Sequence, residues 1–213
     1  RILALTFTKK AASEMKERIA VMVGEKRARR LYMGTFHSVF IRFLREFAES
    51  LGYPSNFTIY DTSDSVSAIK ACVKELQLDE KVYKPKDVLS RISMAKNNLV
   101  TPGAYMRNAA AQQNDAAAKK PRIVDIYALY AKKCKQAGVM DFDDILLMMC
   151  HVLEEFDEQA ARVRKSIGWL TVDEYQDVDL VQDLIFSAIS KPTARFMVGD
   201  IKQSIYGFRG AEP

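Results

Sequence analysis

The sequence has few of the residues from which disulfide frameworks and metal centres are built. Its 213 residues include three cysteines and two histidines. Cys72, Cys134 and Cys150 are widely spaced and form no CxxC pair, so their pattern indicates neither a zinc site nor a disulfide framework. A reducing compartment, most simply the cytoplasm, is therefore the expected location.

Two other kinds of segment are missing. The sequence has no apolar run long enough for a membrane helix and no secretory signal pattern, which favours a protein without a membrane partner. It also has no GxxxxGK[ST] string, the loop whose backbone and lysine bind nucleotide phosphates. The segment VGEKRARR at 23–30 does not have that form. A complete phosphate cradle is therefore not expected within this chain.

The composition supports a folded core and a modest excess of positive charge. Hydrophobic residues make up 48% of the chain and charged residues 28%, which is consistent with one or two folded units. There are 32 Lys and Arg against 27 Asp and Glu, a net charge of +5. This excess suits a polyanion partner without identifying one. The densest basic cluster, EKRARR at 25–30, is either part of such a contact or an ordinary solvated loop.

Two short apolar runs near the carboxyl end of the chain lead into acidic residues. Residues 170–172 and 196–198 are rich in β-formers and apolar, as expected of strands buried on both faces of a parallel sheet. Asp173, Glu174 and Asp200 then lie at the carboxyl ends of these strands. Ligands of open α/β sheets bind at that edge. The placement therefore predicts a site for nucleotide chemistry.

The adjacent Asp173 and Glu174 suit a magnesium nucleotide. One carboxylate can hold the hydrated metal while the next orients and deprotonates an attacking water. Asp173 is the expected metal partner and Glu174 the expected base. The alternative is that both lie in a solvated loop or in the first turn of a following helix, where acidic residues suit the helix dipole.

The longer strings in this part of the chain resemble a known family. VDEYQD at 172–177 and VGDIKQSIYGFRGA at 198–211 resemble motifs II and III of the superfamily-one DNA helicases related to UvrD, Rep and PcrA. TFTKKAASEMKERI at 6–19 resembles their motif Ia and GTFHS at 34–38 their motif Ib, in family order. DFDDIL at 141–146 resembles the acidic segment before motif II.

The resemblance implies roles for individual residues. It gives Asp173 and Glu174 the magnesium and the lytic water, in agreement with the chemistry above, and it makes ATP the substrate. It implies that Gln203 senses the terminal phosphate and that Arg209 is a second sensor. Tyr206 and Phe208 would stack on bases of single-stranded DNA, although Phe208 offers a smaller face than the tryptophan that is usual in the family. Buried core aromatics are the alternative for these two rings.

The amino-terminal motifs can also be interpreted from their chemistry. Residues 2–5 have the pattern of a buried strand, and Thr6 and Thr8 follow before a helix that begins near Lys10. Hydroxyl and N–H groups at such a turn are good phosphate ligands, although helix capping is an equal alternative. The helix should pack Ala11, Met15, Ile19 and Met22 against the core. Family resemblance implies DNA contacts from both motifs, namely Thr6, Phe7, Thr8, Lys9, Thr35, Phe36, His37 and Ser38.

The middle of the chain is predicted to be helical. Asp61 or Thr62 can cap a helix to Glu75, and Pro85 can open another that ends near Lys96. Residues 108–120 are expected to be mobile or a weak helix. Core residues Ile123, Ile126, Tyr127 and Tyr130 indicate a helix that Gly138 ends. Asp141, with Asp143 and Asp144 after it, is interpreted as a helix cap in preference to a metal site.

The expected fold is α/β, a RecA-like parallel sheet flanked by helices with a large all-helical inserted subdomain. Residues 1–35 and 167–213 would form the partial motor core, and residues 36–166 the insertion, which the resemblance places against duplex DNA. Because the phosphate loop is missing and the chain starts inside a strand at Arg1, it is interpreted as a fragment that turns over ATP poorly by itself.

The parent would be an ATP-dependent DNA helicase that couples Mg²⁺-ATP hydrolysis to translocation on single-stranded DNA and to unwinding, with 3′ to 5′ polarity, in repair or recombination. Its expected partners are single-stranded DNA, the junction of single- and double-stranded DNA, and repair or recombination proteins. Three alternatives stay open: a non-catalytic DNA-binding or interaction module, part of a helicase-nuclease, and a metal-dependent nuclease that uses Asp141, Asp143 and Asp144 together with Asp173 and Glu174.

Overall fold

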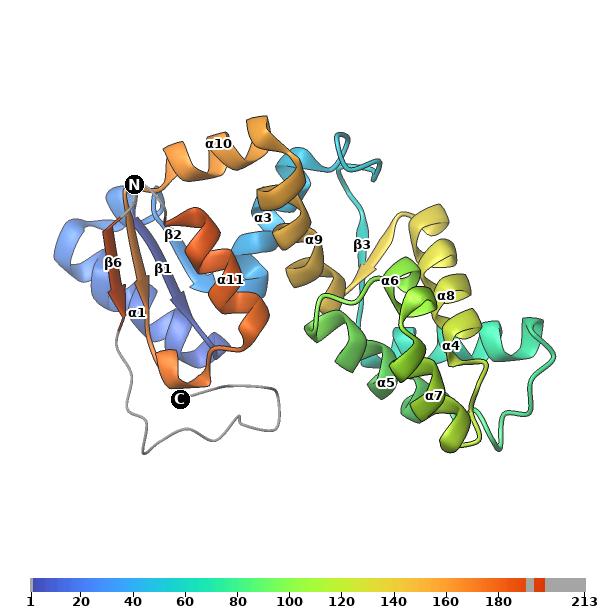
Figure 1. Ribbon diagram of the computed structural model, residues 1–213. Coiled ribbons are helices and arrows are strands. Elements are labelled where there is room, and N and C mark those ends of the chain that lie inside the picture. The colour runs from blue at the N-terminus through green and yellow to red at the C-terminus, as the bar shows by residue number, and fades with distance from the viewer. Residues whose placement is uncertain (1, 191–193, 198–213) are drawn as a thin grey trace. The chain divides into compact units, whose positions relative to one another are not determined.

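The computed structural model of the chain describes residues 2–190 and 194–197 (Figure 1). The chain divides into two compact units. We call residues 1–47 with 148–213 the sheet unit, and residues 48–147 the helical unit. The boundaries between the units, at 47/48 and 147/148, differ from the bounds of the predicted insertion, 36–166. Within the described residues the chain is mixed α/β, and no helix there is long and apolar enough to cross a membrane.

The sheet unit is built on four parallel strands in the order β2-β1-β5-β6. They are β1 (Ile2–Thr6), β2 (Tyr32–Thr35), β5 (Trp169–Val172) and β6 (Ala194–Met197), and Figure 1 shows their arrows side by side. Leu5 pairs with Gly34 on one side and with Val172 on the other. Because all four strands run the same way, the residues that follow β1, β2 and β5 meet at one edge of the sheet.

Apolar strand residues and helix faces form the core of this unit. Leu3 and Leu5 of β1 and Leu170 and Val172 of β5 are buried, as their pattern predicted. The described helices that lie wholly within this unit are α1 (Lys9–Val23), α2 (Glu25–Ala28), α3 (Phe36–Phe47), α10 (Asp157–Ser166), the short 3₁₀ turn η1 (Tyr175–Asp177) and α11 (Leu180–Ile189). Helix α9 (Phe142–Glu155) runs across the division at 147/148.

The predicted core stripe of α1 is shorter than expected. Met15 and Ile19 pack against a cluster of Ala4, Ala28 and Met33. Met22, however, is 81% exposed. The last turn of α1 extends past this cluster before Gly24 ends the helix with a positive φ of 83°. A helical spacing identifies a face, but it does not say how far along the helix the neighbouring sheet continues.

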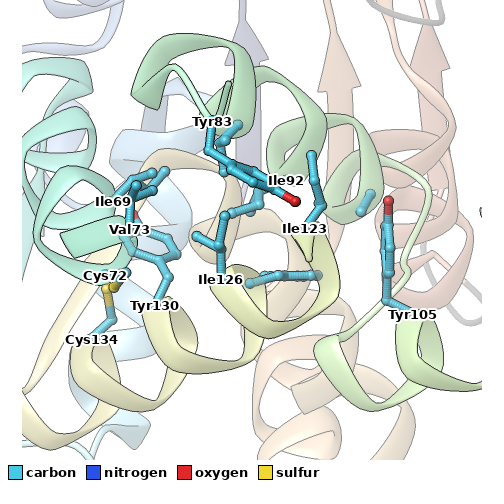
Figure 2. Close-up of a cluster of buried hydrophobic side chains, with 13 residues drawn as sticks. Ile69, Cys72, Val73, Tyr83, Ile92, Tyr105, Ile123, Ile126, Tyr130 and Cys134 are labelled. Carbon is cyan, nitrogen blue, oxygen red and sulfur yellow. The ribbon is translucent and has the colours of Figure 1, made fainter. Parts of the chain in front are cut away.

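The helical unit packs five helices around one buried cluster. They are α4 (Thr62–Glu75), α5 (Pro85–Asn97), α6 (Pro102–Arg107), α7 (Ala109–Ala117) and α8 (Ile123–Ala137). Figure 2 shows the cluster, in which Ile69 and Val73 of α4 meet Ile126 and Tyr130 of α8. All three cysteines of the chain are buried and free.

Most predicted helix boundaries in this unit are confirmed. Asp61 caps α4 through the backbone N–H of Asp64, and Pro85 lies at the start of α5. Gly138 ends α8 in a left-handed conformation. The segment 108–120 forms a helix, α7, capped by Asn108. The expectation of an all-helical segment is wrong in one detail, since β3 (Thr58–Tyr60) and β4 (Val139–Asp141) form a two-stranded parallel sheet.

Candidate nucleotide and DNA site at the carboxyl edge of the sheet

Asp173 and Glu174 follow β5 directly, as predicted. The backbone N–H of Asp173 donates to the carbonyl oxygen of Leu5 (3.1 Å), so the β1–β5 ladder continues one residue past the strand. One carboxylate oxygen of Asp173 accepts from the N–H of Glu174 (3.0 Å). Both side chains are exposed, and neither has an ion pair within the part of the chain that the structure describes. Two uncompensated carboxylates therefore lie at the edge where ligands of such sheets bind.

Glu174 has an unusual backbone conformation. Its φ of 54° and ψ of 44° are left-handed, a region in which a residue other than glycine costs about 1–2 kcal/mol. Of the two predicted alternatives, the first turn of a helix does not fit well, because only the short turn η1 follows and the Glu174 side chain caps none of its N–H groups. The other alternative, a solvated loop, stays open, since both acids are exposed. Strain of this kind collects at functional sites.

The electrostatics of Glu174 suit a base. Partial burial, together with the negative charges of Asp173 and Asp177, raises the pKa of Glu174 above its ordinary value. A raised pKa makes a carboxylate a better proton acceptor near neutral pH. The turn therefore offers two different carboxylates. That of Asp173 has no partner among the described residues other than a backbone N–H, and that of Glu174 has an increased affinity for protons.

The segment after β1 contains the first group of predicted DNA contacts. Thr8 caps α1 by accepting from the N–H of Ala11 (3.1 Å), so the capping alternative holds for its hydroxyl. Lys9 is exposed at the start of α1. Phe7 is half-buried with its ring 5.0 Å from that of Phe36. Thr6 is only 1% exposed, and its hydroxyl has no hydrogen-bond partner among the described residues.

The segment after β2 contains the second group. The Thr35 hydroxyl accepts from the N–H of Ser38 (3.3 Å), and the Ser38 hydroxyl donates to the Thr35 carbonyl (2.8 Å). His37 is half-buried, whereas Ser38 is exposed. Phe36 is 2% exposed and packs against Phe186 of α11, so its ring belongs to the core. Thr6 and Thr35 pair in the β1–β2 register, so both segments leave the sheet at the same level.

The match to known proteins covers the whole of this chain. Residues 1–213 fit the family described as UvrD/REP helicase N-terminal domain. The chain belongs to this family. The resemblance inferred from the VDEYQD and GTFHS strings is thereby confirmed.

Similar proteins from several bacteria are all described as the ATP-dependent DNA helicase PcrA. The chain is 38% identical over 212 residues to the ATP-dependent DNA helicase PcrA of Leuconostoc citreum, 36% to that of Bacillus subtilis and 37% to that of Staphylococcus aureus. Each match covers 99% of this chain and 28% of the relative. The chain thus spans about 28% of the length of the curated relatives it matches.

The predicted site of this UvrD/REP domain extends beyond the described residues. Asp200 and the motif III residues Gln203, Tyr206, Phe208 and Arg209 lie outside the described residues. Their roles as phosphate sensors and stacking residues stay predictions from the resemblance. The described part of the edge therefore comprises the ends of β1, β2 and β5.

The acidic segment at 141–144 has a structural explanation. Asp141 caps α9 by accepting from the N–H of Asp144 (2.9 Å), and Asp144 accepts from the N–H of Asp141 (3.1 Å). The ammonium group of Lys96 lies 2.6 Å from Asp141 and 2.7 Å from Asp144. The Tyr130 hydroxyl also donates to Asp141 (2.8 Å). The interpretation of Asp141 as a helix cap is confirmed.

The sequence reasoning missed the role of Lys96. This side chain is 2% exposed and belongs to the interior of the helical unit. A signal was present, because Val88, Ile92 and Lys96 recur every four residues on the apolar face of α5. No group of three or more His, Cys, Asp or Glu able to hold a metal occurs within residues 2–190 and 194–197. The nuclease alternative therefore gains no support from this acidic segment.

One hollow in the sheet unit lies away from this edge. It measures about 470 Å³ and begins at Tyr32, at the opposite end of β2 from Thr35. Its wall is made of Tyr32, Phe43, Glu46, Phe47, Arg162, Val163, Lys165 and Ser166. None of the predicted site residues lines it, so this hollow is not the candidate site.

Proposed function

We propose that this chain is part of an ATP-dependent DNA helicase, in which the turn after β5 supports nucleotide hydrolysis and the segments after β1 and β2 contact single-stranded DNA. The full protein would couple Mg²⁺-ATP hydrolysis to translocation with 3′ to 5′ polarity and to duplex unwinding at a junction. The observation that carries the proposal is the pair Asp173 and Glu174, exposed and uncompensated among the described residues at the ligand edge of a parallel sheet.

Asp173 fits a hydrated magnesium ion. Magnesium prefers carboxylate oxygens and keeps several waters, so a single exposed carboxylate is a suitable donor. Asp173 has one oxygen hydrogen-bonded to the N–H of Glu174, which fixes the orientation of the carboxylate. When bound, magnesium would neutralise negative charge on the phosphates.

Glu174 would accept the proton of the attacking water. Its raised pKa supports this role, and its left-handed backbone directs the side chain differently from that of a residue in a regular helix. Gln203 and Arg209 are proposed to contact the terminal phosphate. The phosphate cradle itself is not among the strings of this chain, so the nucleotide would need further protein groups.

The DNA part of the proposal rests on the exposed groups at the same edge. Lys9 and Ser38 lie there, and Phe7, Thr35 and His37 are half-buried beside them. Thr6, Thr8 and Phe36 would contribute through their backbone or through supporting contacts, since their side chains are buried or occupied. Tyr206 and Phe208 are proposed to stack on bases.

Glu174→Gln in the full-length protein tests the hydrolytic role. Loss of a general base should lower DNA-stimulated ATP hydrolysis by a factor on the order of 10²–10⁴, with single-stranded DNA binding retained. Glu155→Gln is a matched control, because Glu155 is an exposed glutamate at the end of α9. Unchanged turnover in Glu174→Gln would remove the assigned base. DNA binding by a wild-type protein that never hydrolyses ATP would favour the non-catalytic module.

Lys9→Ala tests the DNA contact. If Lys9 binds a phosphate, its loss should reduce the slope of log affinity against log salt by about 1. Lys165→Ala, at an exposed lysine of α10 away from this edge, is the control. Equal salt dependence in Lys9→Ala and wild type would show that the α1 start lies away from the DNA.

Tyr206→Ala and Phe208→Ala should each weaken single-strand binding by about 1–3 kcal/mol, and wild-type affinity in both would remove the stacking role.

A further inference from the structure

The turn that carries Glu174 is held by a side-chain bond from the next residue. The hydroxyl of Tyr175 donates to a carboxylate oxygen of Asp183 on α11. Both side chains are partly buried, so the bond is shielded from water to some extent. It joins the turn after β5 to a helix that belongs to the same compact unit.

The backbone bonds of the turn are local. The N–H of Asp177 donates to the Glu174 carbonyl (3.0 Å), and the N–H of Val178 donates to the Tyr175 carbonyl (3.1 Å). These bonds close the turn on itself, and the Asp173–Leu5 bond attaches its beginning to the sheet. A left-handed non-glycine residue persists only where its surroundings fix it. The Tyr175–Asp183 bond supplies an anchor directly after Glu174.

Asp183 is itself well supported. Helix α11 begins with a capping box, in which Asp179 accepts from the N–H of Gln182 (2.8 Å) and Gln182 accepts from the N–H of Asp179 (3.3 Å). Ile185, Phe186 and Ile189 bury the other face of α11 in the core. As an acid in the first turn of the helix, Asp183 also interacts favourably with the helix dipole. Its carboxylate thus offers a fixed acceptor.

We propose that Tyr175 and Asp183 are a positioning pair, which holds the Glu174 turn in the conformation that hydrolysis requires. The inference rests on the proposed role of Glu174. Neither residue needs to touch the nucleotide. Their effect is on the orientation of Glu174, so their loss should affect the chemical step more than nucleotide binding.

The test measures DNA-stimulated ATP hydrolysis by full-length variants. Tyr175→Phe removes only the donor, and Asp183→Leu removes the acceptor. Each should lower kcat about 10-fold, the factor expected for one hydrogen bond to a charged group, with KM for ATP within about 2-fold of wild type. Asp183→Asn keeps an acceptor oxygen and should restore most of kcat. The double variant should be no slower than either single one, because both remove the same bond.

Controls separate positioning from general damage to the fold. Tyr105→Phe removes a similar bond, from Tyr105 to Asp115 (2.5 Å), in the helical unit, and should leave kcat unchanged. Wild-type kcat in Tyr175→Phe and Asp183→Leu, with Glu174→Gln inactive, would overturn the positioning pair and leave the proposed function intact. Multiplicative losses in the double variant, or equal loss in Asp183→Asn and Asp183→Leu, would also overturn it. Full activity in Glu174→Gln would instead refute the proposed function.

Discussion

The chain contains two pairs of neighbouring acids with opposite fates. In the helical unit, buried Asp141 and partly buried Asp144 surround the ammonium group of Lys96, and their remaining oxygens accept backbone N–H groups. In the sheet unit, Asp173 and Glu174 are exposed and have no described ion pair. The two pairs look similar in sequence. Within the described residues, what separates them is whether a distant cation satisfies the charge, which marks the first pair as structural and supports a ligand-binding role for the second.

Both units place residues other than glycine in the left-handed region. In the helical unit, Gln77, Leu99 and Lys119 have this backbone just after the ends of helices, as Gly138 has after α8. Glu174, at a φ of 54°, has it between a strand and a short turn, at the ligand edge of the sheet. Its place in the fold, and not the strain alone, therefore distinguishes Glu174.

The largest expected effect comes from removing the buried cation. Lys96→Met leaves the buried carboxylate of Asp141 and the partly buried carboxylate of Asp144 without a counter-ion, and it should lower the free energy of unfolding of the helical unit by about 3–5 kcal/mol. Urea unfolding followed by far-UV circular dichroism measures it. Fluorescence of Trp169, the single tryptophan of the chain, reports separately on the sheet unit.

Lys133→Met is the matched control for that change. Lys133 and Glu75 are also 2.6 Å apart, but 41% and 53% of their side chains are exposed. An exposed pair contributes at most about 1 kcal/mol. Similar losses in the two variants would mean that burial does not distinguish the acidic pairs.

A smaller effect is expected from pH. Burial and the charge of Asp141 raise the pKa of Asp144 to about 6, against the opposing effect of Lys96. The folded state then binds more protons than the unfolded chain between about pH 4 and 6, so this contribution to stability is present below pH 4 and is lost as the pH rises through 6. Asp144→Asn removes the titration.

Comparing the pH dependence of unfolding free energy in wild type and in Asp144→Asn gives the sign of the Asp144 contribution. Between pH 4.5 and pH 7, wild type should lose on the order of 2 kcal/mol of unfolding free energy relative to the variant. The pKa of Asp141 is lowered, so its contribution is lost only at still lower pH and does not enter this window. Parallel stability profiles for the two proteins would show that Asp144 does not titrate there.

The smallest effects test two of the left-handed positions, Gly138 and Glu174. Gly138→Ala should destabilise the chain by about 1–2 kcal/mol, because the conformation disfavours a side chain and the added Cβ would lie 2.8 Å from Pro54. Glu174→Gly should instead stabilise it by about 1 kcal/mol while removing the proposed base. Urea unfolding measures both. Destabilisation by Glu174→Gly would mean that the Glu174 side chain stabilises the turn and that no strain is stored there.

The sequence predicted the features that depend on local pattern. The spacing of nearby residues predicted three features that the structure confirms. They are the strand that begins at Ile2, the helix that contains Ile126 and Tyr130, and the cap at Asp141. Asp173 and Glu174 were placed at a strand end because an apolar run stops just before them.

Other features depend on partners far away in the chain. The burial of Lys96 is set by Asp141 and Asp144, which meet it only after folding. Met22 is exposed because α1 extends past its cluster, a length that no helical spacing encodes. The left-handed backbone of Glu174 follows from tertiary anchors, and its Glu-Tyr context contains no turn signal of the glycine or asparagine type.

The pairing of β1 with β5 has a consequence for synthesis on the ribosome. Leu5 meets Val172 only after the whole helical unit has been made, whereas the contacts of the helical unit lie within residues 48–147. Contacts between distant residues form slowly because a long loop must close first. The helical unit can therefore fold while the strand at 2–6 has only β2 as a partner, and the other, apolar edge of that strand stays open to aggregation until β5 is made.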